Sequence, residues 1–151
     1  MPYLQLDLPG SYPFAVKRDL ARKLGNLYAE IMQTTPDLVA VAFRELGEGN
    51  MWRCRDAEPV PGAVVSCEVR RGRPAVQRER LAAAIFDACI EALGLDPLIL
   101  AVEFTQHAGD ENYFRVKVNG RFVGGLGQDW SPTETETSMV DQMVGRIGVS
   151  R

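Results

Sequence analysis

The chain has 151 residues, of which 46% are hydrophobic and 25% charged, and this composition is typical of one soluble globular domain. Its net charge of −3 gives the whole chain no electrostatic reason to bind nucleic acid or an anionic membrane, so any anion site must be a local cluster. The apolar runs are too short to span a bilayer, and no basic segment followed by an apolar one opens the chain. We therefore expect a cytoplasmic protein without a membrane or nucleic-acid partner.

The chain opens with Pro2 directly behind Met1, at the head of an apolar segment over 3–8 that is typical of a β-strand. If Met1 is removed, Pro2 presents a secondary amine at the start of a rigid element. Such an amine needs only a modest downward pKa shift to act as a base near neutral pH. In the competing interpretation, Pro2 only makes the chain a good substrate for methionine removal.

A helix and a second strand follow. The helix is predicted to end before Thr34, and the strand covers 38–46. Together they complete a first β-α-β unit over about 2–46. The apolar stripe of the helix is Val16, Leu20, Leu24, Leu27 and Ile31.

A loop rich in glycine and proline, which carries Trp52, separates this unit from a second one. There the pattern predicts a strand over 63–70, a turn at Gly72, a helix that Gly94 ends, and a strand over 98–105. Two β-α-β units, about 2–46 and 63–105, predict a single α+β domain over 1–151. Its four-stranded mixed sheet carries both helices on one face.

The second face of that sheet needs a cover. The third strand offers apolar residues on both parities, as in Val64, Val65, Cys67 and Val69. The simplest cover is other copies of the chain, so we expect a homo-oligomer.

Residues 106–151 form the C-terminal part of the domain. A hairpin is predicted with strands over 113–118 and 121–123, joined by Asn119-Gly120, the dipeptide that type I′ turns prefer. The tail carries apolar residues at helical spacing from Met139 to Ile147. A short docked helix and a frayed end both fit this tail.

The cysteine and histidine content argues against a disulfide framework and a metal site. Cys54, Cys67 and Cys89 form no C-x-x-C pair and leave an odd count. Cys89 is expected in the core and the other two as inert thiols. The one histidine, His107, has no second histidine with which to share a metal, and we place it in a loop. No metal and no cofactor are expected.

Three arginines, Arg70, Arg71 and Arg73, lie where the third strand meets the second helix. Guanidiniums in this position can clamp a carboxylate or phosphate, because each binds bidentately and keeps its charge. Alternation places Arg70 and Arg71 on opposite sides. A solvated turn, continued by Arg78 and Arg80, is the alternative interpretation, and a nucleic-acid stripe is the third and weakest one.

A proline after Met1, two β-α-β units and arginines between the third strand and the second helix together resemble the tautomerase superfamily over about the first 105 residues. Residues 2–8 resemble the opening strand of its malonate semialdehyde decarboxylase branch. Arg71-Gly72-Arg73 stands where that branch has an Arg-x-Arg pair. Arg70-x-x-Arg73 resembles the arginine pair of the cis-3-chloroacrylate dehalogenase branch instead, so the branch stays open.

The chain also departs from both branch patterns. Asp37 lies near the acidic residue that precedes the second strand in the decarboxylase branch. Tyr113 stands in place of a tryptophan in the acidic-aromatic segment 109–114. Tyr28 lies close to a helix position where dehalogenases have histidine, and Glu103 stands where they have tyrosine.

The resemblance implies a homotrimer whose three sheets surround a central barrel, with Pro2 as the catalytic amine and Asp37 as a further catalytic candidate. A free-base Pro2 would move a proton between carbon and oxygen of a small 2-oxo acid, whose carboxylate the arginines would hold. A protonated Pro2 would instead serve hydration of an unsaturated acid or decarboxylation of a 3-oxo acid, with Asp37, Glu103 or Glu111 activating water. If Met1 stays, Pro2 is an amide without basicity, and a non-catalytic oligomer that binds anions or a partner protein remains.

Overall fold

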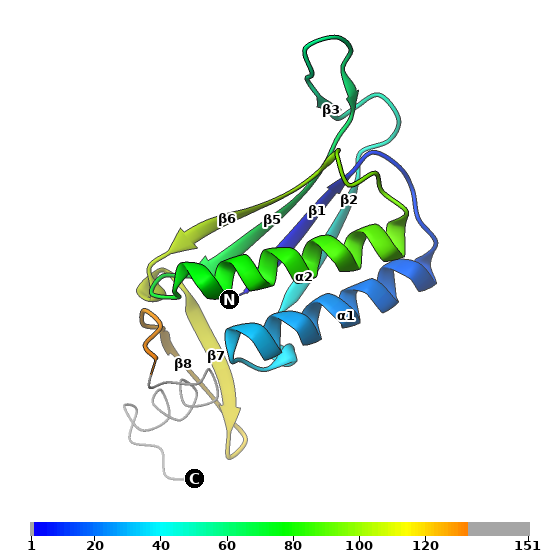
Figure 1. Cartoon of the computed structure of the whole chain (residues 1–151). Helices are drawn as coiled ribbons and strands as arrows, with labels where there is room; N and C mark the ends of the chain where they lie inside the picture. Colours follow the sequence, from blue (N-terminus) through cyan, green and yellow to red (C-terminus); the bar gives the residue numbers. More distant parts are fainter. Residues whose placement is uncertain (1, 133–151) are drawn as a thin grey trace.

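A four-stranded mixed sheet forms the centre of the computed structural model, which describes residues 2–132 (Figure 1). Its strand order is β2-β1-β5-β6. The pairs β1–β2 and β5–β6 are parallel, and the central pair β1–β5 is antiparallel. The two predicted β-α-β units therefore lie side by side in one sheet. The strands are β1 (Tyr3–Leu8), β2 (Ala40–Glu45), β5 (Ala63–Arg70) and β6 (Leu100–His107).

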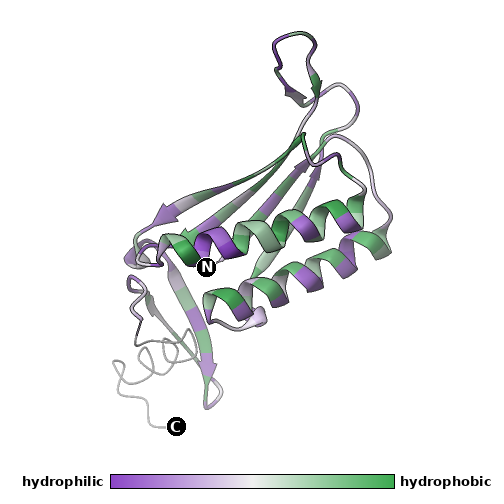
Figure 2. Cartoon of the chain, viewed as in Figure 1, coloured by the Kyte–Doolittle hydropathy of each residue, from purple (hydrophilic) through white to green (hydrophobic). Residues whose placement is uncertain are grey.

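Two long helices, α1 (Phe14–Met32) and α2 (Ala75–Leu93), cover the same face of the sheet (Figure 1). Hydrophobic and hydrophilic bands alternate along both helices, as expected for amphipathic helices that bury one side (Figure 2). The core between helices and sheet is made by alternate residues of the strands and by the helical stripes. Its fully buried members include Leu4, Leu6, Leu8, Leu24, Val65, Cys67, Leu81, Ile85 and Cys89.

Proline and glycine mark the ends of these helices. Pro13 and Pro74 stand directly before α1 and α2. Gly94 ends α2 in the left-handed conformation, with φ of 64°, and its amide donates to the carbonyl of Ile90. The prediction that Gly94 caps this helix is confirmed.

Several strand boundaries differ from the prediction. The second strand begins at Ala40, because Pro36–Leu38 form the 3-10 helix η1. The fourth strand continues to His107, because that residue pairs with Arg70 of β5. The placement of His107 in a loop was therefore wrong.

The expected distribution of apolar residues over both faces of β5 is also wrong. Val65, Cys67 and Val69 all lie on the helix-covered face and are fully buried. Only Val64, of the four residues that suggested an apolar second face, lies on the other side.

That other side, which we call the outer face, is chiefly polar. Tyr3 donates from its hydroxyl to Gln5 at 3.2 Å, and the Gln5 amide donates to Asp7 at 3.3 Å. Side chains on neighbouring strands continue the network. The pairs are Arg44–Asp7 at 3.1 Å and Ser66–Glu103 at 2.8 Å.

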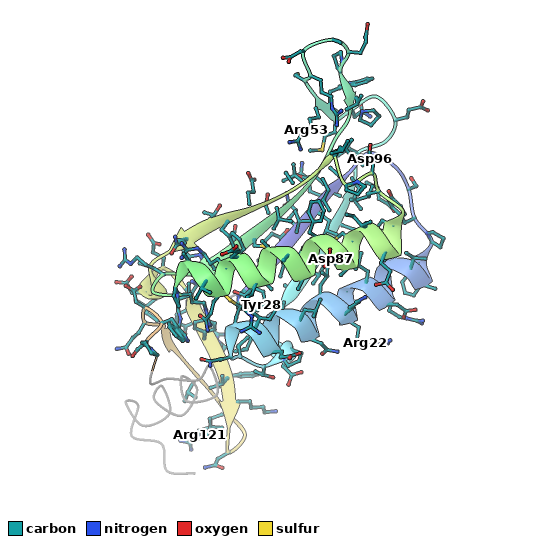
Figure 3. All side chains as sticks on the ribbon, viewed as in Figure 1. Arg22, Tyr28, Arg53, Asp87, Asp96 and Arg121 are labelled. Carbon is teal, nitrogen blue, oxygen red and sulfur yellow. The ribbon has the colours of Figure 1, made fainter. Side chains whose placement is uncertain are left out.

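Two hairpins project from opposite ends of the sheet (Figure 1). The short hairpin of β3 (Trp52–Arg53) and β4 (Val60–Pro61) occupies the glycine- and proline-rich loop between the two units. The longer one pairs β7 (Tyr113–Val118) with β8 (Arg121–Leu126). Figure 3 shows Arg53 on the first hairpin and Arg121 near the tip of the second.

Asn119 and Gly120 join β7 to β8 with positive φ values of 49° and 80°. Type I′ turns require positive φ at both central residues, so the hairpin prediction is confirmed. The predicted helix of the tail, from Met139 to Ile147, lies outside the described residues. Within residues 2–132, no helix is long and apolar enough to cross a membrane.

Candidate active site

One end of the sheet gathers the start of β1 and the ends of β5 and β6. In the antiparallel β1–β5 ladder, Tyr3 lies opposite Glu68. One further step along this register sets Pro2 opposite Val69 and next to the arginine run. The carbonyl of Pro2 also accepts a hydrogen bond from the amide of Ala40, at 3.0 Å, which fixes the start of β1 against β2.

Arg70 is the last residue of β5, and its side chain is only 7% exposed. It shares the outer face with Ser66 and Glu68, because alternate residues of a strand point to the same side. Arg71 follows immediately and is exposed, and its Nε lies 2.8 Å from an Asp129 carboxylate oxygen. The two neighbouring arginines therefore separate, as alternation predicts.

Arg73 is directed into the protein. Its side chain is 2% exposed, and Nη1 donates a hydrogen bond to the carbonyl oxygen of Met32, the last residue of α1. The last carbonyls of a helix have no partner within the helix and carry partial negative charge, so a guanidinium suits this position. The guanidinium also lies over the Trp130 ring, 5.2 Å from its centroid. Arg73 thus connects α1, the start of α2 and the segment after β8.

Residues 127–130, which we call the strap, run across the end of the sheet after β8. The Trp130 amide donates to the Arg71 carbonyl at 2.8 Å. Asp129 accepts from the Gly109 amide at 2.8 Å and from Arg71, and these two donors hold the pKa of its carboxyl below the ordinary value. Gly72 has φ of 109°, and a Cβ there would lie 2.3 Å from the Trp130 carbonyl oxygen. Only glycine fits where the strap approaches so closely.

Sequence reasoning missed Asp129 and Trp130. The available signal was the density of glycines in Gly124-Gly125-Leu126-Gly127, which marks backbone packed closely against other elements. Nothing local to these residues indicates which segment they approach.

His107 lies at the same end of the sheet, directly opposite Arg70 in the β5–β6 ladder. Its carbonyl accepts from the Arg71 amide at 2.8 Å, so the histidine is held against the arginine run. Burial lowers the pKa of the imidazole first, and the positive charges of the amino terminus and Arg70 lower it further. The carboxylates of Glu68 and Glu111 oppose this shift. The imidazole is therefore neutral at pH 7.

Of the remaining acidic candidates, Asp37 lies at this end of the sheet, because η1 directly precedes the start of β2, which pairs with the start of β1. Asp37 is exposed in η1, and its amide donates to Thr35 Oγ1 at 3.4 Å. Glu103 lies near the middle of the outer face. Glu111 accepts from the Ala108 amide at 2.8 Å.

Tyr28 is 1% exposed and belongs to the core between helices and sheet. The position that resembles a catalytic histidine of the dehalogenase branch is therefore buried in the helix layer.

An open pocket of about 500 Å³ lies beside Arg71, on the strap side of the sheet end. Its lining mixes a guanidinium, two carboxylates and backbone. The lining residues are Arg71, Asp110, Leu126, Gly127, Gln128 and Asp129.

The fold matches several solved structures closely enough to define its class. The structure of Pt0534 inactivated by 2-oxo-3-pentynoate aligns with a TM-score of 0.65 at 17% identity, over 83% of this chain and 94% of that one. A symmetric trimer of wild-type fused 4-OT gives 0.64 at 17% identity over the same shares. Macrophage migration inhibitory factor from Toxoplasma gondii gives 0.63 at 18% identity, over 80% of this chain and 98% of that one. This chain has a tautomerase-like fold.

No family model and no curated protein matches the sequence. At these identities the structural likeness establishes the tautomerase fold, so the expected fold class is confirmed. In this tautomerase fold, Pro2 stands at the head of the first strand and Arg70 at the end of the third sheet strand along the chain, β5.

The described part of the tautomerase fold offers no group of three or more metal-ligating side chains. Burial raises the pKa of the Cys67 and Cys89 thiols to about 12. Both are therefore protonated at neutral pH and unreactive, as expected for core cysteines. Cys54 is exposed on the connection that follows β3.

Proposed function

We propose that this chain is a tautomerase-like isomerase that acts on small 2-oxo carboxylic acids. After removal of Met1, the Pro2 amine is the base and acid of the reaction. The observation that carries this proposal is the antiparallel pairing of β1 with β5, because it brings the Pro2 end of the chain beside Arg70. The tautomerase fold supports the same interpretation.

The chemistry follows from the surroundings of the amine. An α-amino group ordinarily titrates at about 7.7 to 8.0, and the positive charge of Arg70 disfavours its protonated form. A substantial unprotonated fraction is therefore present near neutral pH. The Pro2 nitrogen takes a proton from the carbon beside the carbonyl, and the released electron pair forms a carbon–carbon double bond. The carbonyl oxygen gains the charge and then a proton, which gives the enol.

Arg70 holds the substrate carboxylate in this proposal and stabilises the charge that develops on the neighbouring oxygen. Arg71 is the second carboxylate candidate, because it borders the open pocket. Arg73 remains a candidate as well, although its guanidinium contacts Met32 and Trp130 here. Asp37 is the proposed further catalytic group, and its exposed position would require the substrate to extend past η1.

A second reaction class is hydration or dehalogenation of an unsaturated acid, or decarboxylation of a 3-oxo acid, with protonated Pro2 as the acid. Pt0534, which was inactivated by the unsaturated acid 2-oxo-3-pentynoate, has the same fold, and this likeness supports an unsaturated acid as a substrate class. If Met1 is retained, the amine mechanism is lost. The proposal is then a non-catalytic oligomer that binds an anion or a partner protein at the arginines.

We propose a cytoplasmic homotrimer as the working assembly. The fused 4-OT neighbour is itself a trimer, and in such a trimer the polar outer faces of the sheets would line a central barrel. The sequence suggested an apolar outer face, but hydrogen-bonded polar pairs occupy it, so contacts between subunits at this face would be chiefly polar.

The test begins with the intact mass of the protein from its native host, which distinguishes a Met1 from a Pro2 terminus. Ketonisation of enol phenylpyruvate by the processed protein is then compared with that of Pro2→Ala, which lacks the secondary amine. We expect a loss of about 100-fold or more in kcat/KM, typical of a missing acid–base group. An unchanged rate would refute the amine mechanism.

A further inference from the structure

The sheet end that carries Pro2 and Arg70 also carries the one histidine of the chain. His107 is the last residue of β6 and the register partner of Arg70. Opposite residues of neighbouring strands point to the same face, so His107 and Arg70 share the outer face. The Arg71 amide donates to the His107 carbonyl, which keeps the ends of β5 and β6 together.

Arg70 occupies the central strand of three. The strand order is β1-β5-β6, so Pro2 lies on one side of β5, opposite the preceding residue Val69, and His107 flanks Arg70 on the other side. Strands are spaced by about 4.8 Å, which separates the backbones of the two flanking residues by roughly 10 Å. A small acid whose carboxylate is bound by Arg70 would have an ionisable group on each side.

We propose that His107 is the second acid–base residue of the site and acts on the substrate oxygen, while Pro2 acts on carbon. This inference rests on the proposed isomerase function. It assigns to His107 a proton-transfer step that the resemblance gave to none of the residues of this chain.

The proton transfers balance in both directions. In ketonisation the neutral imidazole takes the proton of the enol hydroxyl, and the oxygen–hydrogen pair becomes the carbonyl π bond. The electron pair of the carbon–carbon double bond takes a proton from the Pro2 ammonium. Enolisation runs the same steps backwards, from protonated His107 and free Pro2. The pair holds one proton in either direction, so its two pKa values belong to the pair.

The charges around His107 favour the form that ketonisation needs. Burial and the charge of Arg70 lower the pKa of the imidazole below its ordinary value of 6.5, and Glu68 and Glu111 limit the shift. The amine ordinarily titrates higher, at about 7.7 to 8.0. Between the two pKa values, Pro2 carries the proton and His107 is neutral.

The first test is the pH dependence of kcat/KM for enol phenylpyruvate with the processed protein. We expect a bell-shaped profile for the wild type. His107→Gln should lose the acid limb and about 100-fold of the maximum. Gln106→Ala, which changes the neighbouring exposed side chain, should keep the full profile. An unchanged acid limb in His107→Gln, with Pro2→Ala inactive, would overturn the role of His107 and leave the isomerase proposal standing. Full activity of Pro2→Ala would overturn both.

The second test measures the electrostatic interaction between Pro2 and His107 and does not depend on catalysis. Because the chain has one histidine, a single imidazole titrates in the NMR spectrum. Acetylation of the Pro2 amine removes its positive charge, so the pKa of His107 should rise. An unchanged titration of His107 would show that the two groups do not interact and would overturn the proposal.

Discussion

The guanidinium of Arg73 lies between the carbonyl of Met32, to which it donates, and the ring of Trp130. Arg73 thereby contacts the end of the first helix, 41 residues earlier in the sequence, and the strap that follows β8. The arginine that both branch resemblances share therefore contributes to the packing of the domain.

Arg73→Ala should lower the free energy of unfolding by about 2 to 3 kcal/mol. The change removes a charged hydrogen bond at a helix end and a cation–π contact. Chemical denaturation of the variant measures the loss, with Arg80→Ala on the exposed side of α2 as the matched control. A stability equal to that of the control would mean that the buried contacts contribute nothing.

Arg70→Ala should be the most damaging arginine variant for catalysis, with a loss of roughly 100-fold in kcat/KM. A bidentate contact to a carboxylate is worth about 2 to 3 kcal/mol, and Arg70 ends β5 on the outer face, beside His107 and the amino-terminal end of β1. Steady-state kinetics of both variants, each checked for folding, give the comparison. A larger loss in Arg71→Ala would favour the decarboxylase-like arrangement and the pocket beside the strap.

The Asp129 carboxylate should make the strap sensitive to acid. Its pKa is lowered from the ordinary value of 3.8, first by the Gly109 amide and then by Arg71. A lowered pKa means that the stabilisation is present above the ordinary value and is lost as the pH falls through the lowered one. Trp130 emission, recorded in a Trp52→Phe background, should therefore change below pH 3.8.

At pH 7, Asp129→Asn should already show the Trp130 emission that the wild type reaches only in acid. It should also lose most of the change in emission on acidification. Asp110→Asn, a carboxylate of the same pocket, is the control and should behave as the wild type. Identical acid titrations of Asp129→Asn and the wild type would argue against the ion pair as the anchor of the strap.

The protein should sediment as a trimer at micromolar concentration. Ser66→Arg, which adds a charge to the middle of the outer face, should give monomers if that face lines the barrel. Glu79→Arg on the exposed side of α2 should leave the trimer intact. A monomeric wild type would contradict the proposed assembly.

Local pattern was enough to determine most of the fold. The stripe from Val16 to Ile31 predicted α1, and the segment 63–70 was predicted with the bounds that β5 has. Gly94 and Asn119-Gly120 predicted their turns correctly, because the tolerance for positive φ depends on the residue type itself. The arginines at the end of β5 and the proline at the head of β1 could be predicted as well, because strand ends are also marked by local sequence.

Contacts between distant segments decided the rest. Whether Val64 shares a face with Val65 follows from strand parity, but whether the outer face is polar depends on what β1, β2 and β6 bring beside β5. The register of β6 with β5 places His107 beside Arg70. The partners of Arg73 are a helix end and a strap, both distant in the sequence. Periodicity reports the side of an element on which a residue lies, and only the packed sheet determines which other residue it meets there.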